Sequence, residues 1–541
     1  MKQIIKEIVK ETIKNLYDVD IEPQIQLPKE ESFGDFASNV AFLLSKSLKQ
    51  KPQDIASYIA DSLKNMSYFE KVEALNGFVN MKLSSVFYEK ILFEFLENPI
   101  NYLKDETIFE AFGIKNDDKI NLEYVSANPT GPLHLGHGRG AVIGDVLYRL
   151  FRFFDIKVDR EYYINDAGNQ VNLLAKSVLH YINPNIYPFP EDGYKGDYIK
   201  DLAKEFLKEH NLEALHTCQD IDFEAVKDFA ISKMMEDIKN TLKLLNVEFD
   251  IYFSERTLKD KVEKVFELLR EKNLIEEKEG AIWFKSKDEG KDRVLRKSDG
   301  SYTYFASDIA YHLDKYQRGY KKAVDLWGAD HHGYIPRLKS ALEAIDIPKD
   351  WLSVELFQIV RLFEDGQEVR MSKRTGKMLK LSDVIEDIGA DNLRFMFLTK
   401  KADTPLDIDI NLVRTQNSEN PVFYVQYAYA RTMGIKRQLK EPFSFGFYKD
   451  RYIYEEEELE LMKRILSSKD MLFEGVIKKD PSLVVKLSLD IAKSFHKFYN
   501  THKVITPDEA ITKKRISLVY ATQKIFDIIF DILNIKAPEI M

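Results

Sequence analysis

The segment INLEYVSANPTGPLHLGHGRGAVIGDVLYRLF, residues 120–151, decides the fold. It opens with an apolar run over 120–125, passes through a turn rich in glycine and proline, and then shows apolar residues at helical spacing over 142–151. A strand, a glycine-rich turn and a helix in this order form the first half of a nucleotide-binding α/β unit. The segment therefore predicts a Rossmann-like α/β domain.

The turn itself has the composition of an anion site. Gly136, Gly138 and Gly140 allow close approach to backbone N–H groups at the positive end of the following helix, and His134 and His137 add side-chain donors. Such donors would stabilise the charge of a phosphate undergoing displacement. A loop with two surface histidines and a metal-binding pair are the alternatives. We predict no metal, because no third ligand lies at a useful spacing nearby.

A second basic stretch is EVRMSKRTGKML, residues 368–379, a polar loop that crowds Arg370, Lys373, Arg374 and Lys377 together. By itself it would be a solvated basic loop.

The remaining pattern divides the chain into several domains, as its length of 541 residues requires. We predict strands at 161–166 and 323–328, a hairpin between 281–285 and 302–305 with a turn at Asp299-Gly300, and a solvated helix face at 455–460. The predicted domains are an N-terminal α/β domain (1–110), a Rossmann-like α/β catalytic domain (111–360) with a helical insertion at about 167–265, a connecting region (361–415), and a C-terminal all-α helical bundle (416–541).

Composition narrows the class of protein. The single cysteine, Cys218, excludes an intramolecular disulfide framework and Cys-rich zinc sites, so we predict a cytoplasmic protein without protein-bound zinc. No stretch reaches membrane-spanning length, and the N-terminus has no signal-peptide pattern. The net charge of −9 disfavours a general nucleic-acid coat. Residues 421–541, however, carry 20 Lys and Arg against 16 Asp and Glu, which is weak evidence for a polyanionic partner.

Together, HLGH (134–137) and RMSKR (370–374) resemble the paired ATP-binding motifs of class I aminoacyl-tRNA synthetases, HIGH and KMSKS. Arg370 replaces the first lysine of the second motif and Lys373 keeps the second. The resemblance implies catalytic roles for His134, His137 and Lys373. It implies ATP binding by Ala127, Asn128, Pro129, Thr130, Gly131, Pro132, Leu133, His134, Leu135, Gly136, His137, Arg370, Met371, Ser372 and Lys373.

Longer strings are similar to the arginyl-tRNA synthetase family over nearly the whole chain. They are ANPTGPLHLGH (127–137), YTYFASDIAYHLDKYQRG (302–319), WGADHHGY (327–334) and the final APEIM. The resemblance implies arginine binding by Glu123, Asn128, Tyr304, Asp308, Asp330 and His331, and anticodon contacts by Tyr424, Tyr427, Arg431, Tyr499 and Met541. It also implies that the N-terminal domain, with FGDFASN (33–39) and NGFVN (76–80), contacts the outer corner of tRNA.

The implied reaction is ATP-dependent ligation of L-arginine to its tRNA in two steps. Mg-ATP would first activate arginine as an adenylate, and a hydroxyl of the terminal adenosine of tRNA would then accept the arginyl group. The family typically needs bound tRNA for the first step, so we predict the same here, and a monomer. A carboxylate fork around a guanidinium would need no editing domain, because analogues that lack the charge leave buried acids unpaired.

Four alternatives stay open from the sequence. Glu123 could be a structural acid that pairs with a neighbouring cation, and Tyr424 and Tyr427 have a spacing that core aromatics share. A different HxGH nucleotidyltransferase would be a much shorter chain without an aromatic helical end. A tRNA-binding module that has lost its chemistry is disfavoured by the joint presence of His134, His137 and Lys373.

Overall fold

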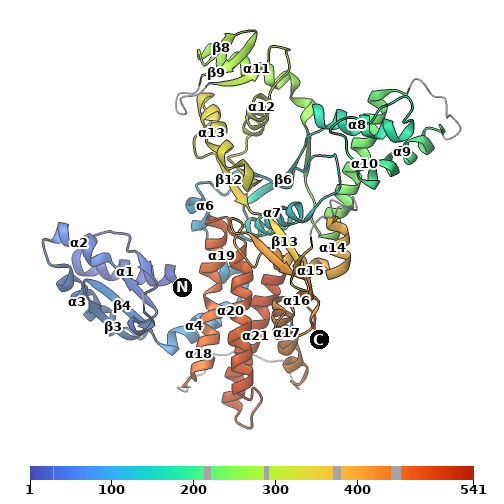
Figure 1. The fold of residues 1–541 in the computed structure, drawn as a ribbon. Coiled ribbons are helices and arrows are strands. Elements are labelled where there is room, and N and C mark those ends of the chain that lie inside the picture. The colour runs from blue at the N-terminus through green and yellow to red at the C-terminus, as the bar shows by residue number, and fades with distance from the viewer. Residues whose placement is uncertain (29, 213–220, 286–291, 370–378, 440–452) are drawn as a thin grey trace.

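A computed structural model describes residues 1–28, 30–212, 221–285, 292–369, 379–439 and 453–541 (Figure 1). Its centre is a sheet of five parallel strands in the order β12-β11-β5-β6-β7, with helices packed on it. The strands are β5 (Lys119–Glu123), β6 (Lys157–Ile164), β7 (Ile251–Ser254), β11 (Lys322–Gly328) and β12 (Leu352–Phe357). The predicted Rossmann-like α/β catalytic fold is confirmed.

The quoted segment forms the middle of this sheet and the helix beside it. Residues 120–123 of β5 are buried, and the apolar stripe of α7 (Leu135–Phe153) packs against the core through Val142, Val146 and Leu150. Gly144 sits at a close approach, because a Cβ there would lie 2.2 Å from the Tyr124 ring. Strand and helix therefore hold the turn between them in a fixed place.

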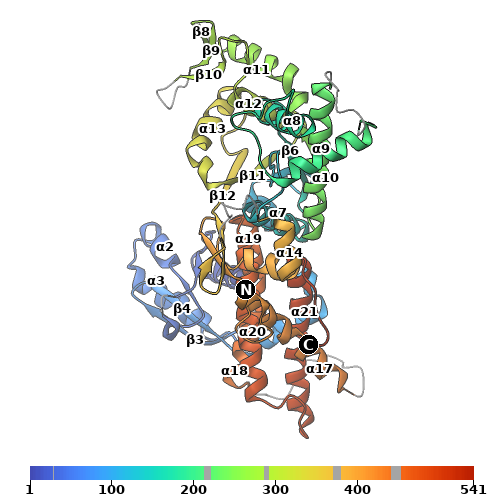
Figure 2. The same cartoon turned by 45° about the vertical axis from the view of Figure 1, so that its right-hand side comes forward.

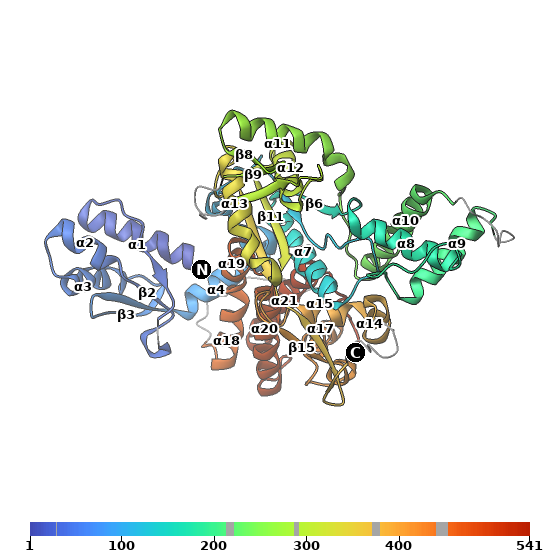
Figure 3. The same cartoon turned by 45° about the horizontal axis from the view of Figure 1, so that its top comes forward.

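A helical projection leaves the sheet after β6. Its helices are α8 (Asn169–Ile182), α9 (Asp197–Glu209) and α10 (Phe223–Leu244), which have an apolar core of their own. Figures 1 and 3 show this projection on the side opposite the N-terminal domain. The helical part ends earlier than predicted, because the apolar run Ile251–Ser254 returns to the sheet as its edge strand before α11 (Lys259–Glu271) begins.

The predicted hairpin between 281–285 and 302–305 is wrong. The strand β9 (Ala281–Phe284) pairs with β8 (Ile275–Lys278) and β10 (Arg293–Arg296) instead. Residues 304 and 305 begin α12 (Tyr304–Gln317), because the Thr303 side chain caps that helix by accepting from the Ala306 N–H. The turn at Asp299-Gly300 does form, with Gly300 at a φ of 83°.

The N-terminal domain is an antiparallel sheet in the order β1-β2-β4-β3 with helices packed on it. Its elements are α1 (Lys2–Tyr17), β1 (Ile25–Gln26), η1 (Glu31–Phe33), β2 (Phe36–Ser38), α2 (Val40–Leu48), α3 (Pro52–Leu63), β3 (Phe69–Leu75) and β4 (Phe78–Leu83). The helices α4 (Ser85–Glu97), α5 (Pro99–Leu103) and α6 (Thr107–Phe112) lead from this domain to the central sheet.

The C-terminal region is helical, as predicted. It consists of α17 (Pro421–Arg437), α18 (Glu456–Leu466), α19 (Ser468–Ile477), α20 (Ser482–Thr501) and α21 (Glu509–Leu533). The acidic run at 455–460 is only partly a solvated face, because Glu458 is buried and pairs with Arg515 at 2.7 Å. Among the described residues, no helix has the length and apolarity needed to cross a membrane.

The crossover from β11 to β12 consists of η3 (Ala329–Tyr334) and α13 (Ile335–Ala344). A connecting region then joins the sheet to the bundle (Figure 2). Its elements are β13 (Val360–Glu364), β14 (Gln367–Glu368), α14 (Leu381–Ile388), α15 (Ala390–Phe397), β15 (Leu406–Asp409) and α16 (Ile410–Arg414). Arg394 of α15 is fully buried and donates to Asp145 of α7 at 2.6 Å and to the carbonyls of Leu245 and Leu533 at 2.7 and 2.8 Å. One guanidinium thus joins the catalytic helix to the ends of α10 and α21.

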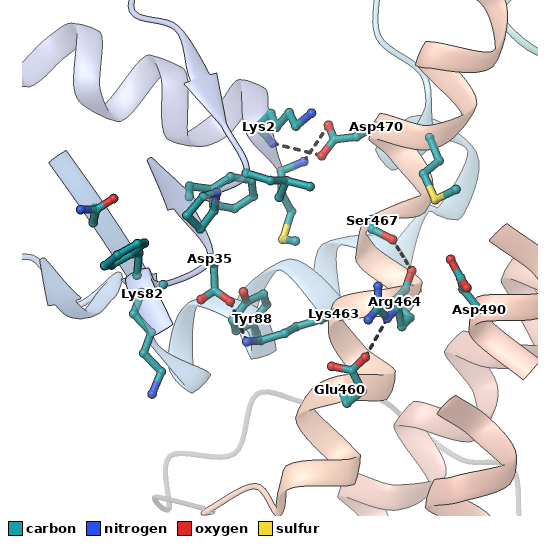
Figure 4. A pocket seen from close by; sticks show the side chains of 18 of the residues that line it. Lys2, Asp35, Lys82, Tyr88, Glu460, Lys463, Arg464, Ser467, Asp470 and Asp490 are labelled. Carbon is teal, nitrogen blue, oxygen red and sulfur yellow. Dashed lines mark hydrogen bonds and ion pairs between the residues drawn. The ribbon is translucent and has the colours of Figure 1, made fainter. Parts of the chain in front are cut away.

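The N-terminal domain meets the bundle through a more open, polar contact (Figure 4). Lys463 donates to Asp35 at 2.7 Å, and the Lys2 backbone N–H donates to Asp470 at 3.3 Å. A cavity of about 860 Å³ lies between the two parts and is lined by lysines and carboxylates from both. This junction is held by partly exposed ion pairs, unlike the buried contact at Arg394.

Candidate active site

The chain leaves β5 through a strained corner. Val125 and Ser126 have φ values of 68° and 39°, in the left-handed region that a β-branched residue rarely adopts. Two hydrogen bonds hold the corner and the residue after it. The Tyr163 N–H donates to Ser126 Oγ at 3.1 Å, and the Tyr162 hydroxyl donates to the Ala127 carbonyl at 2.7 Å. Strain that the surroundings impose in this way is typical of functional sites.

Two stacked imidazoles begin α7. The His134 and His137 rings lie 3.7 Å apart with an interplanar angle of 18°. The Gly136 N–H donates to His134 Nδ1 at 3.1 Å, and the His134 N–H donates to His137 Nδ1 at 3.3 Å. Because each Nδ1 accepts a hydrogen bond, each ring carries its proton on Nε2.

Both rings are neutral in this setting. Burial lowers the pKa of His134, and burial together with the neighbouring ring lowers the pKa of His137 to about 3. The pair therefore presents neutral Nε2–H donors next to the first-turn N–H groups of a 19-residue helix. Such a cluster of donors binds phosphate oxygens without needing an ionised imidazole.

The second motif falls on residues whose structure is not described. Arg370, Met371, Ser372 and Lys373 all lie outside the described residues. The chain after them is described from residue 379, and the Leu381 N–H donates to the Leu133 carbonyl at 2.8 Å. Arg139 of α7 also donates to the carbonyls of Gln358, Lys401 and Thr404 at 2.8 to 3.0 Å. Leu381, three residues beyond residue 378, is thus bonded to the residue before His134, and residues 358, 401 and 404 are bonded to Arg139 of α7.

Glu123, one of the two predicted arginine-binding acids, already has a cation. Its Oε2 accepts from Lys315 Nζ at 2.5 Å, and its Oε1 accepts from Ser126 Oγ at 2.9 Å. Lys315 is fully buried and also donates to Asp325 at 2.9 Å, and Asp325 contacts the His312 ring at 2.9 Å. Burial raises the pKa of Glu123 while Lys315 opposes that rise. Both carboxylate oxygens are therefore occupied within the protein.

Asp308, the other predicted acid, lies in a different environment. Burial raises its pKa, and its only described side-chain partner is the Tyr334 hydroxyl, which donates to Oδ2. Glu255, at the start of η2 (Glu255–Leu258), lies close enough for the two charges to interact. Burial, then Asp308 and then Asp166, raise the pKa of Glu255 to about 7, although Tyr163 opposes the rise.

No cation within the described chain neutralises this second acid pair. Glu255 Oε2 is enclosed and has no hydrogen-bond partner among the described residues. Burial raises the pKa of both acids, and the charge of Asp308 adds to the rise at Glu255. Such acids are suited to a cationic ligand, because the ligand supplies the missing charge. Glu255 and Asp308 are therefore better placed than Glu123 to receive a guanidinium.

The sequence reasoning missed Glu255. It lies directly after β7, at the carboxyl end of a parallel strand, where ligands of such sheets bind. The signal for it is the apolar run IYFS just before it, which the predicted boundary at about 265 assigns to the helical insertion instead of the sheet.

The other predicted arginine-binding residues are more exposed. Tyr304 is 57% exposed, and its pKa is raised by burial and by Glu255, which places its hydroxyl near the acid pair. Asn128 donates to Gln170 at 2.7 Å. Asp330 and His331 lie on η3, largely exposed, with His331 Nε2 3.6 Å from Asp330. Of these side chains, Tyr304 and His331 lie close enough to interact with the acid pair.

A second site lies in the bundle. Tyr424, Tyr427 and Arg431 of α17 line a cavity of about 290 Å³ together with residues of α20. Arg431 also lies over the Tyr499 ring, 4.7 Å from its centroid. Met541 is 46% exposed and does not line the cavity, although Arg437 donates to the nearby Glu539 carbonyl at 3.1 Å.

A parallel nucleotide-binding sheet with an HLGH helix start and a separate helical bundle defines the class I aminoacyl-tRNA synthetases. Three family models agree: "tRNA synthetases class I (R), catalytic domain" matches residues 100–405, "Arginyl tRNA synthetase N terminal domain" matches 3–83, and "DALR anticodon binding domain" matches 425–541. The chain belongs to the arginyl-tRNA synthetase family.

Relatives share its whole length. An arginine–tRNA ligase of Aquifex aeolicus is 41% identical with all of both chains covered, and one of Campylobacter jejuni is 39% identical with 99% of each covered. A crystal structure titled as a putative arginyl-tRNA synthetase from Campylobacter jejuni superposes with a TM-score of 0.73 and 36% identity over 85% of this chain and all of that one. The Thermus thermophilus arginyl-tRNA synthetase has the same fold, with a TM-score of 0.73, 20% identity and all of both chains covered.

Proposed function

We propose that this chain joins L-arginine to its tRNA, using Mg-ATP and passing through an arginyl-adenylate. The observation that carries the proposal is that one domain holds two unlike sites: neutral phosphate donors at the start of α7, and an unneutralised acid pair formed by the residue after β7 and a residue near the start of α12. The family membership of the full chain supports the same activity.

In the first step the arginine carboxylate attacks the α-phosphorus of ATP, and pyrophosphate leaves. His134 and His137 donate through Nε2 to phosphate oxygens, and the N-terminal end of α7 adds its dipole. We assign Lys373 to the same phosphates by its place in the RMSKR motif. No side chain acts as a nucleophile, so the rate depends on position and charge.

Arginine recognition falls to Glu255 and Asp308 in this proposal. A planar guanidinium can donate to both carboxylates, and burial makes each bond stronger than it would be in water. Tyr304 would cover the pair, and Asn128 would hold the α-amino and carboxylate groups. Glu123 then has a supporting role, because Lys315 and Ser126 occupy its oxygens.

In the second step a hydroxyl of the terminal adenosine of tRNA accepts the arginyl group. The bundle would receive unstacked anticodon bases on its aromatic side chains, where every base can stack whatever its sequence. The tRNA is also expected to be needed for the first step.

Pyrophosphate exchange into ATP tests this proposal with each amino acid in turn, with and without tRNA. Exchange with arginine alone, and only when tRNA is present, is the expected result. Exchange without tRNA would overturn the predicted tRNA requirement but not the ligation. No exchange with any amino acid, together with retained tRNA binding, would leave a binding module. Release of pyrophosphate from CTP would instead support a different nucleotidyltransferase.

A further inference from the structure

The cavity in the bundle contains an arginine whose position is fixed on three sides. The Arg431 guanidinium lies 4.4 Å from the Tyr427 ring centroid and 4.7 Å from that of Tyr499, so two aromatic rings hold it. Its Nη2 donates to the Tyr427 hydroxyl at 3.3 Å, and its Nη1 contacts His496 Nδ1 at 3.0 Å. Because the aromatic rings contact the face of the guanidinium, the N–H groups that are not bonded to Tyr427 or His496 can donate to a ligand in the cavity.

The partners of His496 fix its tautomer. A guanidinium can only donate, so His496 Nδ1 must accept from Arg431. The other nitrogen, Nε2, lies 3.1 Å from the Tyr424 carbonyl oxygen, which can only accept, so Nε2 carries the proton. The residue is 7% exposed, and its ring bridges the backbone of α17 at Tyr424 to the side chain of Arg431 further along the same helix.

We infer that His496 is a positioning residue, which holds Arg431 so that its free N–H groups face an unstacked base with acceptor atoms on its edge. This inference rests on the proposed function, because it takes the cavity to be an anticodon-loop site. The cavity of about 290 Å³ also has Phe423 on its lining, parallel to Tyr427 within 20° and 5.8 Å away, as a wall for a flat ring. Aromatic walls with an arginine donor are suited to a nucleobase.

Only the neutral form of His496 can hold Arg431 in this way. Protonation would remove the acceptor and place two cations 3.0 Å apart. The described groups that face the ring are Arg431, Tyr424 and Tyr427 from α17 and Phe495 from its own helix, and none of them is an acid. Burial, opposed by the Tyr424 carbonyl, lowers the pKa of His496, which keeps the neutral form at physiological pH.

The test compares two variants of the full-length protein in steady-state aminoacylation. His496→Phe keeps a ring but loses both polar atoms, whereas His496→Asn places an oxygen near the position of Nδ1. We expect the Phe variant to raise KM for tRNA about tenfold, as for the loss of one hydrogen bond to a charged group, and to leave kcat unchanged. The Asn variant should restore most of the affinity. His502→Asn, further along the same chain and outside the cavity lining, is the matched control with wild-type KM.

Acid pH gives a second readout. KM for tRNA of the wild-type chain should rise in acid, once the pH falls far enough to protonate His496, whose pKa is lowered by burial, and that of the Asn variant should not. Equal KM values for wild type and the Phe variant would overturn the inference, and so would Phe and Asn variants that are equally impaired, because that result indicates a merely structural ring. Failure of the proposed function differs from both: the wild-type chain would then not charge tRNA with arginine at all.

Discussion

Two pairs of acids lie in the catalytic domain, Glu123 with Asp325, which are buried, and Glu255 with Asp308, which are half-buried, and the pairs differ in whether a cation neutralises them. Glu123 and Asp325 share the ammonium of Lys315, which is fully buried with them. Glu255 and Asp308 have raised pKa values and, within the described chain, have no cation. The first pair is complete without a ligand. In the proposed function the positive charge of arginine completes the second pair, so the missing cation, and not the acids themselves, points to a binding site.

The largest effect should come from removing the internal cation. Lys315→Met leaves Glu123 and Asp325 buried without a counter-charge, which should reduce the free energy of unfolding by about 3–5 kcal/mol. Urea denaturation measures it. The double variant Lys315→Met with Glu123→Gln should recover part of the loss. A single variant as stable as the wild type would show that the first pair does not depend on its cation.

Removing an acid from the second pair should instead affect arginine. Asp308→Asn should weaken arginine binding by about 2–5 kcal/mol, because a desolvated guanidinium loses one of its charged partners. Steady-state kinetics with varied arginine measure this as a rise in KM. The unfolding free energy should not fall, since the substitution relieves repulsion. An unchanged arginine KM would remove Asp308 from the site.

A smaller effect is expected from Glu255→Gln, which keeps the shape and removes the charge. The arginine KM should rise by the equivalent of about 1.5–3 kcal/mol, the usual contribution of a hydrogen bond to a charged group. Glu123→Gln is the comparison, because its oxygens bind Lys315 and Ser126 and its effect should fall mainly on stability. If Glu123→Gln raised the arginine KM more than Glu255→Gln, the assignment of the two pairs would be reversed.

The smallest effect is a pH dependence. The pKa of Glu255 is raised to about 7, so below that pH the free protein holds a proton that a guanidinium must displace. Arginine affinity should fall by at most about tenfold per pH unit below 7 and level off above it.

The free energy of unfolding should change with pH in the opposite direction to the arginine affinity. Between pH 4.5 and 7 the folded chain binds more protons at Glu255 than the unfolded chain does, so the free energy of unfolding due to this group falls as the pH rises. Saturating arginine should remove that decline. Calorimetric titration of the wild type and of Glu255→Gln measures both trends, and a flat profile in the wild type would contradict them.

The sequence predicts the fold correctly where the residues concerned are neighbours along the chain. Residues 120–151 carry strand, turn and helix in one run, so the core of the sheet and the place of His134 and His137 follow from local pattern alone. The hairpin at 281–305 failed because the Thr303 side chain, a single capping oxygen, starts a helix where two aromatic residues indicated a strand.

The assignment of the acids depended on contacts that local pattern does not contain. Glu123 meets Lys315 from 192 positions away, and no spacing rule reports that pairing. Glu255 follows a four-residue strand at the edge of the sheet, and so short an apolar run is ambiguous between strand and helix. Predicting which acid is free required knowing which cations fold back against the sheet.

The buried guanidinium of Arg394 has a consequence for the length of RNA that the protein can bind. It bonds at once to the catalytic helix and to the last turn of the longest bundle helix, so the bundle cannot shift against the sheet without leaving a charge unsolvated. Arg394 therefore opposes changes in the distance between the phosphate turn and the bundle that holds the aromatic cavity. An RNA whose two functional ends lie closer together or further apart than the phosphate turn and the aromatic cavity would have to bend to reach both sites. The protein would therefore select its RNA by length as well as by base sequence.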